Sequence, residues 1–324
     1  MTSSHAPCFV IGTGRCGSTL LSELMHMHPD VLSLSEFFAV LGGERAFARE
    51  VVDGAELERM LFACDPLVRE YLAAAPIAEV WRNVDLLRRD EISPLLLVPL
   101  PQLSDAPEQL AQALRCEVAR FERAPIACQF ERVFSFLART LGRARWVERS
   151  GSSIDYADCV RRHWPRAKFV YMLRRGPECA LSMSKHPVFR ARVARATERN
   201  PALGVAQCLT RDVPVDRFGA YWSAALAKMQ RIVDAGARQD YLVLAYENLL
   251  QDPQRELATL WRFLGVADPD QNILRSMCER IRPDAGILGL GAVERAQLER
   301  ACRPGMRIVE RLLSRAQPSA AHSR

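Results

Sequence analysis

The chain has 324 residues, of which 49% are hydrophobic and 25% are charged. This composition supplies a packed core and excludes a disordered, collagenous or coiled-coil protein. The 44 basic and 38 acidic residues leave a net charge of +6, which mildly favours anionic ligands and does not argue for nucleic-acid binding. At about 150 residues per domain, the length suits one large domain or two small ones.

We expect a cytoplasmic protein without a metal site. The ten cysteines are scattered, with no CxxC pair and no Cys/His cluster at zinc spacing, and we predict that they are free thiols. Residues 1–7 are polar and short, unlike a secretory signal. The most apolar run, residues 92–100, contains two prolines and is far below the ~20 residues that a membrane span needs, so we expect none.

The first predicted strand covers residues 8–11, an apolar run between Pro7 and the glycines of a turn. Helical spacing follows from Ser18 and stops at Pro29, and residues 31–36 then alternate between apolar and polar side chains as a second strand does. From about 42 to 142 the pattern is mostly helical, and prolines divide it into pieces. We therefore predict a large helical insertion in this region.

Three further strands are predicted at 145–148, 168–173 and 241–245. Helices are expected at 154–164, from Pro177, at 216–235, and from Pro253 to just before Gly265. Strands that alternate with helices indicate parallel pairing, with helices on both faces of the sheet. We predict a three-layer α/β/α fold with a central parallel sheet, forming one domain over residues 1–316, and a flexible tail at 317–324.

The loop Gly12–Thr19, with the sequence GTGRCGST, connects the first strand to the first helix, where backbone N–H groups are able to hold a phosphate. A Walker A loop requires lysine where Ser18 stands, which disfavours a nucleoside triphosphatase. A dinucleotide fingerprint fits the GxGxxG spacing, with Glu36 as the downstream acid, but the helical stretch after Glu36 does not continue the required strand–helix repeat. A tight turn without a ligand is the remaining alternative.

The same loop resembles the 5′-phosphosulfate loop of sulfotransferases that use 3′-phosphoadenylyl sulfate (PAPS), a family with a P-loop-like fold. In that family a basic residue and hydroxyls replace the Walker lysine and the magnesium ligands, because a sulfuryl group is transferred. The resemblance implies donor binding, without a metal, by the six residues Gly14, Arg15, Cys16, Gly17, Ser18 and Thr19.

A second motif lies at the end of the strand 168–173. Arg174 follows this strand, a Gly-Pro turn comes next, and Ser182 stands eight residues after Arg174. A guanidinium and a hydroxyl in these places can converge on one phosphate, although a surface arginine beside a helix start is the plainer interpretation. The segment resembles the 3′-phosphate motif of the same sulfotransferases, in which an arginine and a serine at this spacing hold the nucleotide.

Two more segments are similar to that family, and the fit is nearest to its bacterial-type and carbohydrate-type branch. Tyr246 begins YENLLQDP, which resembles a signature whose tyrosine usually lies against the adenine; packing at a strand end explains Tyr246 almost as well. Arg149 stands where relatives often carry a lysine. Gly151 occupies the position of their catalytic histidine, so this chain lacks the family's usual base. Arg282 is a candidate C-terminal nucleotide contact.

Sulfuryl transfer to an alcohol requires compensation of charge on the leaving 3′,5′-bisphosphate (PAP) and a base for the acceptor proton. We assign the charge compensation to Arg15 and Arg149, and the base to Glu36, which follows the second strand. The alternative for Glu36 is a structural ion pair with an arginine. His186 is the second candidate base, although a helix end explains it more simply.

The sequence thus predicts a PAPS-dependent sulfotransferase that acts on a hydroxyl or amine of a small molecule, lipid or sugar, with PAP as the product. The rivals are an NAD(P)- or flavin-dependent oxidoreductase and a catalytically inactive nucleotide-binding relative. A homodimer stays open. Five aromatic residues of the insertion suit either an acceptor pocket or the core, namely Trp81, Phe121, Phe130, Phe134 and Phe136.

Overall fold

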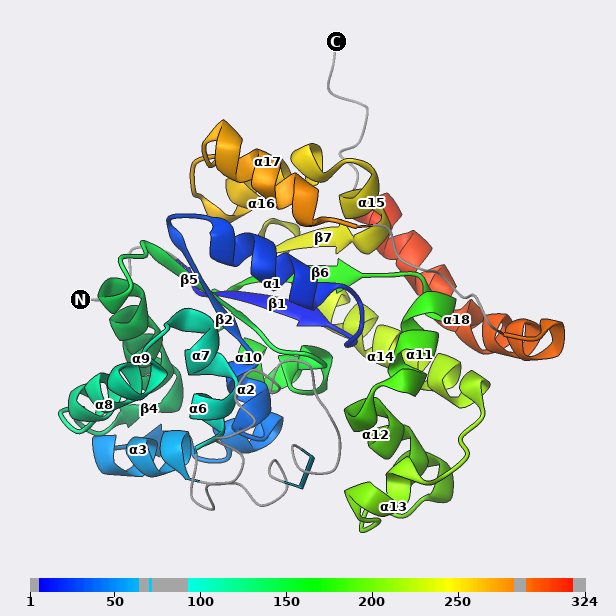
Figure 1. The fold of residues 1–324 in the computed structure, drawn as a ribbon, viewed down its shortest axis with the longest axis horizontal. Coiled ribbons are helices and arrows are strands. Elements are labelled where there is room, and N and C mark those ends of the chain that lie inside the picture. Colours follow the sequence, from blue (N-terminus) through cyan, green and yellow to red (C-terminus); the bar gives the residue numbers. More distant parts are fainter. Residues whose placement is uncertain (1–5, 64–69, 72–92, 283–289, 317–324) are drawn as a thin grey trace.

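The computed structural model of the chain describes residues 6–63, 70–71, 93–282 and 290–316. Five parallel strands form its central sheet, in the spatial order β2-β5-β1-β6-β7 (Figure 1). Their bounds are β1 (Cys8–Gly12), β2 (Val31–Ser35), β5 (Arg145–Arg149), β6 (Lys168–Leu173) and β7 (Tyr241–Ala245). The predicted parallel sheet is therefore confirmed, and each predicted strand agrees with an observed one to within one residue at either end.

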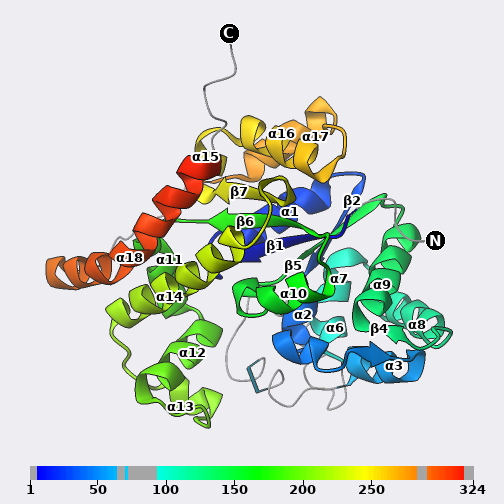
Figure 2. The same cartoon turned by 180° about the vertical axis from the view of Figure 1, so that it is seen from behind.

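Helices cover both faces of the sheet because successive side chains of each strand point to opposite sides. Cys8 and Val10 face one core, which is closed by α1 (Ser18–Met27), α15 (Tyr246–Gln251), α16 (Pro253–Leu264) and α17 (Gln271–Arg280). Phe9 and Ile11 face the other core. Figure 1 shows α1 in front of the sheet, and Figure 2 shows α10 and α14 over the opposite face.

The second core is covered by the helices α9 (Ile126–Thr140), α10 (Ala157–His163), α11 (Gly176–Lys185), α14 (Val215–Asp234) and α18 (Ala292–Ala316). Trp222 of α14 is fully buried and fits against α18 at Gly305, where a Cβ would lie 2.4 Å from the indole ring. Two further helices, α12 (Pro187–Glu198) and α13 (Val205–Leu209), connect α11 to α14. Single turns of 3₁₀-helix are η3 (Ser153–Asp155) and η4 (Arg238–Asp240).

The predicted insertion is helical in its described parts, with η1 (Gly43–Phe47), α3 (Gly54–Phe62), α6 (Pro94–Leu97), α7 (Pro99–Leu103) and α8 (Pro107–Val118), and the short helix α2 (Phe37–Val40) comes just before it. The insertion also contains an antiparallel pair that the sequence analysis did not predict, β3 (Val51–Val52) with β4 (Ala124–Pro125). Two-residue strands are too short to show a period. The single-domain boundary at 316 stays a prediction, and the tail 317–324 lies outside the described residues.

The aromatic residues of the insertion belong to the core where the structure describes them. Phe130 and Phe134 are fully buried beside Phe37 and Phe38, with ring centroids 4.9 Å apart for Phe37–Phe134 and 5.0 Å for Phe38–Phe130. Phe121 and Phe136 are partly buried against the same cluster, and Trp81 lies outside the described residues. Across the described ranges, no helix is long and apolar enough to cross a membrane.

Candidate functional site

Most of the predicted site residues lie just beyond the carboxyl ends of parallel strands, the edge at which α/β sheets bind ligands. The glycine-rich loop follows the central strand β1, Glu36 follows β2, Arg174 follows β6 and Tyr246 follows β7. Arg149 is the last residue of β5. The topology therefore brings these residues to one edge of the sheet.

The loop between β1 and α1 requires its glycines. Gly14 and Gly17 have left-handed backbone conformations, with φ of +83° and +91°. A Cβ at Gly14 would lie 2.1 Å from Cζ of Phe189, and one at Gly17 would lie 2.3 Å from Cδ2 of Tyr246. Two aromatic rings thus lie directly on the loop, where only glycine leaves them room.

The start of α1 is open for an anion. Its first helical residues are Ser18 and Thr19, both of which line the cavity described below, and Gly17 precedes them without a capping side chain. The first N–H groups of a helix have no partner within the helix, and they attract negative charge. Cys16 is different, since its thiol is fully buried in the core beneath α1, which leaves only its main chain for a ligand.

Three predicted donor-binding residues converge on Arg15. The Arg15 Nε donates to Ser182 Oγ at 3.1 Å, and the Arg174 Nη1 donates to the carbonyl oxygen of Arg15 at 2.8 Å. The Arg174 guanidinium also lies over the ring of Tyr246, 4.8 Å from its centroid. Residues from four separate segments thus form one cationic group around the loop.

Glu36 and Arg149 form an ion pair at the ends of β2 and β5. The Arg149 side chain is only 2% exposed, and its Nη2 also donates to Ser35 Oγ at 2.7 Å. The Glu36 carboxylate accepts the Gly151 N–H at 3.0 Å and 2.9 Å through its two oxygens, and it is still 17% exposed. Glu36 therefore has the arginine partner considered as its alternative role, and it faces the cavity as well.

Gly151, which the resemblance predicts at the histidine position, contributes its backbone N–H to the site. Its N–H holds the Glu36 carboxylate, and a Cβ there would lie 3.3 Å from Glu36 Oε1. The Glu36 N–H in turn donates to the Arg149 carbonyl oxygen at 2.7 Å. Both the main chain and the side chain of Glu36 are thereby fixed by the end of β5.

A buried acid supports this arrangement from beneath, and sequence reasoning missed it. Glu148 accepts hydrogen bonds from Ser150 Oγ at 2.6 Å and from the Phe38 N–H at 3.4 Å, and the Ala39 N–H donates to Ser150 Oγ at 3.2 Å. Burial raises the pKa of Glu148 to about 8. The available signal was an acidic residue within the otherwise buried strand β5.

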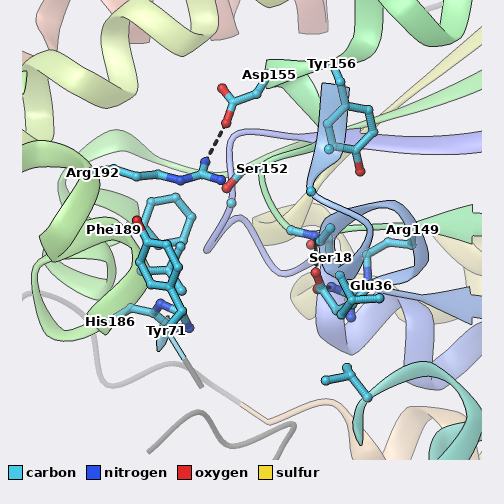
Figure 3. Close-up of a pocket in the computed structure, with 18 of the residues that line it drawn as sticks. Ser18, Glu36, Tyr71, Arg149, Ser152, Asp155, Tyr156, His186, Phe189 and Arg192 are labelled. Carbon is cyan, nitrogen blue, oxygen red and sulfur yellow. Dashed lines mark hydrogen bonds and ion pairs between the residues drawn. The ribbon is translucent and has the colours of Figure 1, made fainter. Parts of the chain in front are cut away.

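A cavity of about 550 Å³ lies beside the loop, within the range of ~300–1,000 Å³ usual for small-molecule sites. Figure 3 shows Glu36 and Arg149 on one side of it and Asp155, Phe189 and Arg192 on the other. Of the four described non-glycine residues with left-handed φ, three line this cavity, namely Arg15, Glu36 and Ser152. Backbone strain of this kind gathers at functional sites, which marks the cavity as a candidate.

The remaining predicted residues divide into two groups. His186, the second candidate base, ends α11 and lines the same cavity as Glu36. Arg282 is exposed and does not line it.

The sequence analysis did not single out Tyr71, Asp155, Phe189 or Arg192, which also line the cavity, because none of them belongs to a recognised motif. In the described parts of the chain, no three His, Cys, Asp or Glu side chains gather as a metal site requires.

Comparisons with known proteins agree with this geometry. The family model of the sulfotransferase family matches residues 7–270. The sulfotransferase domain from the Synechococcus PCC 7002 olefin synthase is 17% identical, with a TM-score of 0.51, and the match covers 97% of this chain and 98% of that one. The sulfotransferase domain from the curacin biosynthetic pathway is 16% identical, with a TM-score of 0.53 and coverage of 96% and 99%.

At these identities the two structures show a shared fold and nothing finer. No curated protein matches the sequence significantly. The family match extends from the residues before β1 to the residues after α16, and so includes all five strands of the sheet and the loop, Arg149, Arg174 and Tyr246. The chain belongs to the sulfotransferase family.

Proposed function

We propose that the protein transfers a sulfuryl group from PAPS to a hydroxyl or amine of a small-molecule acceptor, and releases PAP. The observation that supports this most strongly is the convergence of Arg174, Ser182 and Tyr246 on Arg15 and its loop. A tight turn without a ligand has no need of two arginines, an open helix start and an aromatic ring at one place.

The residues present fit a nucleotide with two separate anionic groups. The open N-terminus of α1 and the Arg15 guanidinium suit the 5′-phosphosulfate, while Arg174 and Ser182 suit the 3′-phosphate. Tyr246, already beneath a guanidinium, offers an aromatic surface for the adenine. PAPS, when bound, supplies the sulfuryl group and the leaving bisphosphate.

The chain's own residues would do the rest of the chemistry. Glu36 takes the proton of the acceptor hydroxyl while the oxygen of that hydroxyl attacks the sulfur. In the same step the bond between the sulfur and the 5′-phosphate oxygen breaks. Arg149 and the Gly151 N–H hold the Glu36 carboxylate toward the cavity. Arg15 and the N–H groups at the start of α1 stabilise the charge that develops on PAP. His186 lines the same cavity and is the second candidate for the base.

Two rivals make different predictions. The oxidoreductase required Glu36 to hold a ribose, whereas this carboxylate is paired with Arg149, and family membership also favours a transferase. A catalytically inactive relative would bind PAP without turnover.

We also propose a cytoplasmic location, which suits the free thiols of the nine described cysteines. A homodimer remains a prediction.

Calorimetric titration of the purified protein with PAP, with NAD and ATP in parallel, tests the donor site. We expect PAP alone to bind tightly. Tight binding of NAD, or hydrolysis of ATP, contradicts the proposal. Transfer from radiolabelled PAPS to a panel of alcohols then separates an active enzyme from an inactive relative, since only the former forms a sulfated product.

A further inference from the structure

The cavity carries a second polar site, separate from Glu36 and Arg149. Asp155 ends η3, Arg192 lies on α12, and the distance from Arg192 Nη1 to Asp155 Oδ2 is 2.5 Å. Both side chains line the cavity, and Figure 3 shows them across it from Glu36. The cavity therefore has charged groups at these two places, and Glu44 and Arg45 line it as well.

Most of the cavity lining is apolar, and its apolar residues include Ala39, Val40, Val98, Tyr156, Val188 and Phe189. A ligand that reaches from one polar site to the other therefore buries a hydrophobic body along the way. This polarity suits a molecule with an apolar middle and a polar group at each end.

Asp155 and Arg192 are fixed in position, and Arg192 also has a side-chain hydrogen bond with Tyr221, but the Asp155 carboxylate is not fully satisfied. The Lys228 Nζ donates to the Asp155 carbonyl oxygen at 2.5 Å, and the Arg192 guanidinium lies 5.9 Å from the centroid of the Phe189 ring. The Asp155 side chain is still 45% exposed, and its Oδ1 has no hydrogen-bond partner among the residues that the structure describes. An ion pair that only tied η3 to α12 would not need to leave a carboxylate oxygen facing a ligand-sized cavity.

We infer that Asp155 and Arg192 bind a second, neutral polar group of the acceptor, such as an amide or a hydroxyl, away from the hydroxyl that is sulfated. This inference rests on the proposed function. An amide suits the pair because its N–H donates to Asp155 while its carbonyl oxygen accepts from Arg192. A carboxylate would meet the negative charge of Asp155, and an alkyl end would strip water from the pair without replacing its hydrogen bonds. The acceptor is therefore an elongated alcohol with an apolar middle and a neutral polar end.

A matched set of acceptors tests this chemistry. The set is 1-octanol, 8-hydroxyoctanamide, 1,8-octanediol and 8-hydroxyoctanoate, with six- and ten-carbon versions to cover the unknown spacing. kcat/KM for sulfuryl transfer from labelled PAPS is measured for each, and the value for the diol is halved for its two reactive ends. We expect the amide and the diol to exceed the alkanol by roughly 10-fold or more, as for one added charge-assisted hydrogen bond, and the carboxylate to rank below the amide.

Two variants assign the effect to the pair. Arg192→Met is expected to bring amide and alkanol to within about 3-fold of each other, because the donor to the carbonyl is gone. Asp155→Asn is expected to make the hydroxycarboxylate nearly as good an acceptor as the amide, because it removes the repelling charge and retains Arg192. A purely structural pair predicts no such gain. The control is Arg211→Met, which removes an exposed ion pair to Glu198 at the end of α12, the helix that also carries Arg192. We expect it to change neither the ratio of amide to alkanol nor the ratio of amide to carboxylate.

Calorimetry of each acceptor with the protein alone adds a readout that does not depend on transfer. Equal kcat/KM for alkanol and amide, or a preference that survives Arg192→Met, overturns the inference. Binding of PAP without binding of any acceptor overturns it as well and leaves the donor site in place. Acceptors that bind in the expected order to a protein that does not bind PAP would support the second polar site and refute the proposed function.

Discussion

The two walls of the cavity are built from different parts of the polypeptide. The wall that we propose for the donor presents mostly main chain to the cavity, at Gly14 and at the open start of α1, together with the Arg15 side chain. The opposite wall consists of side chains, with Asp155 and Arg192 among apolar neighbours. Substitutions therefore alter the second wall directly, whereas at the glycines of the loop they first distort the backbone. Acceptor preference can change in this protein while donor binding stays constant.

The strongest test of this division acts at the junction of the two walls. We expect Glu36→Gln to lower turnover by about 10²–10⁴-fold, because the amide cannot take the acceptor proton, while the affinity for PAP stays nearly constant. Transfer assays with the best acceptor and calorimetry with PAP measure the two quantities. His186→Gln is the matched variant; if it loses turnover and Glu36→Gln keeps it, the base is His186.

On the donor wall, Arg174→Ala is expected to weaken PAP binding by about 2–4 kcal/mol, because a charge-assisted contact to the 3′-phosphate is lost. Titration calorimetry gives the affinity directly. The neighbouring Arg175, whose guanidinium pairs with Glu178 at 3.7 Å, provides the control variant Arg175→Ala with little expected change. Unchanged affinity of the Arg174 variant would refute the 3′-phosphate assignment.

A pair of glycine variants separates backbone strain from loss of the ring that lies on the loop. Gly17→Ala places a methyl group 2.3 Å from the Tyr246 ring at φ +91°, and we expect it to lower stability by more than ~1 kcal/mol and PAP affinity by roughly 10-fold. Gly142 also has a left-handed φ, +66°, but nothing lies within 4 Å of its Cβ position. Gly142→Ala should therefore lower the free energy of unfolding, as measured by urea unfolding, and leave the affinity for PAP unchanged. Equal PAP affinities for both variants would show that Tyr246 does not contribute.

The last prediction concerns pH and tests stability alone. The pKa of Glu148 is about 8 in the folded protein because of burial, against about 4.3 when unfolded, so the folded state binds more protons between these values. Stability should therefore fall as pH rises from about 5 to 8, by at most ~1.4 kcal/mol per pH unit. Urea unfolding at several pH values measures the slope, and Glu148→Gln should reduce it. Parallel profiles for the two proteins would contradict the assignment.

The sheet and the donor wall were largely predictable from sequence because both depend on local signals. Apolar runs mark β1, β6 and β7, alternation of apolar and polar residues marks β2, and a strand end fixes where Arg174 and Tyr246 lie. Helix α16 begins at the predicted Pro253, where the Asp252 side chain accepts the Arg255 N–H as a cap. Local patterns that agree with tertiary structure are the ones that sequence reasoning finds.

The rest depends on contacts between segments that are distant in the sequence. Helix α18 was not predicted, since Pro304 and Gly305 interrupt its helical pattern; in the structure Gly305 makes room for Trp222. The meeting of Asp155 with Arg192 requires η3 and α12 to pack beside one cavity, and no spacing in either segment shows this. Such pairs become visible only after the fold has assembled them.

The left-handed backbone at Arg15, Glu36 and Ser152 also restricts how the protein can vary over generations. Each such residue carries roughly 1–3 kcal/mol of strain, and glycine, asparagine and aspartate adopt this conformation most readily. Valine, isoleucine or threonine at these positions would destabilise the folded protein, whatever effect the new side chain had on activity. A saturation library at these three sites should therefore return few folded members, whereas one at residues 188 and 192 should return many. New acceptor specificities would then arise first from α12.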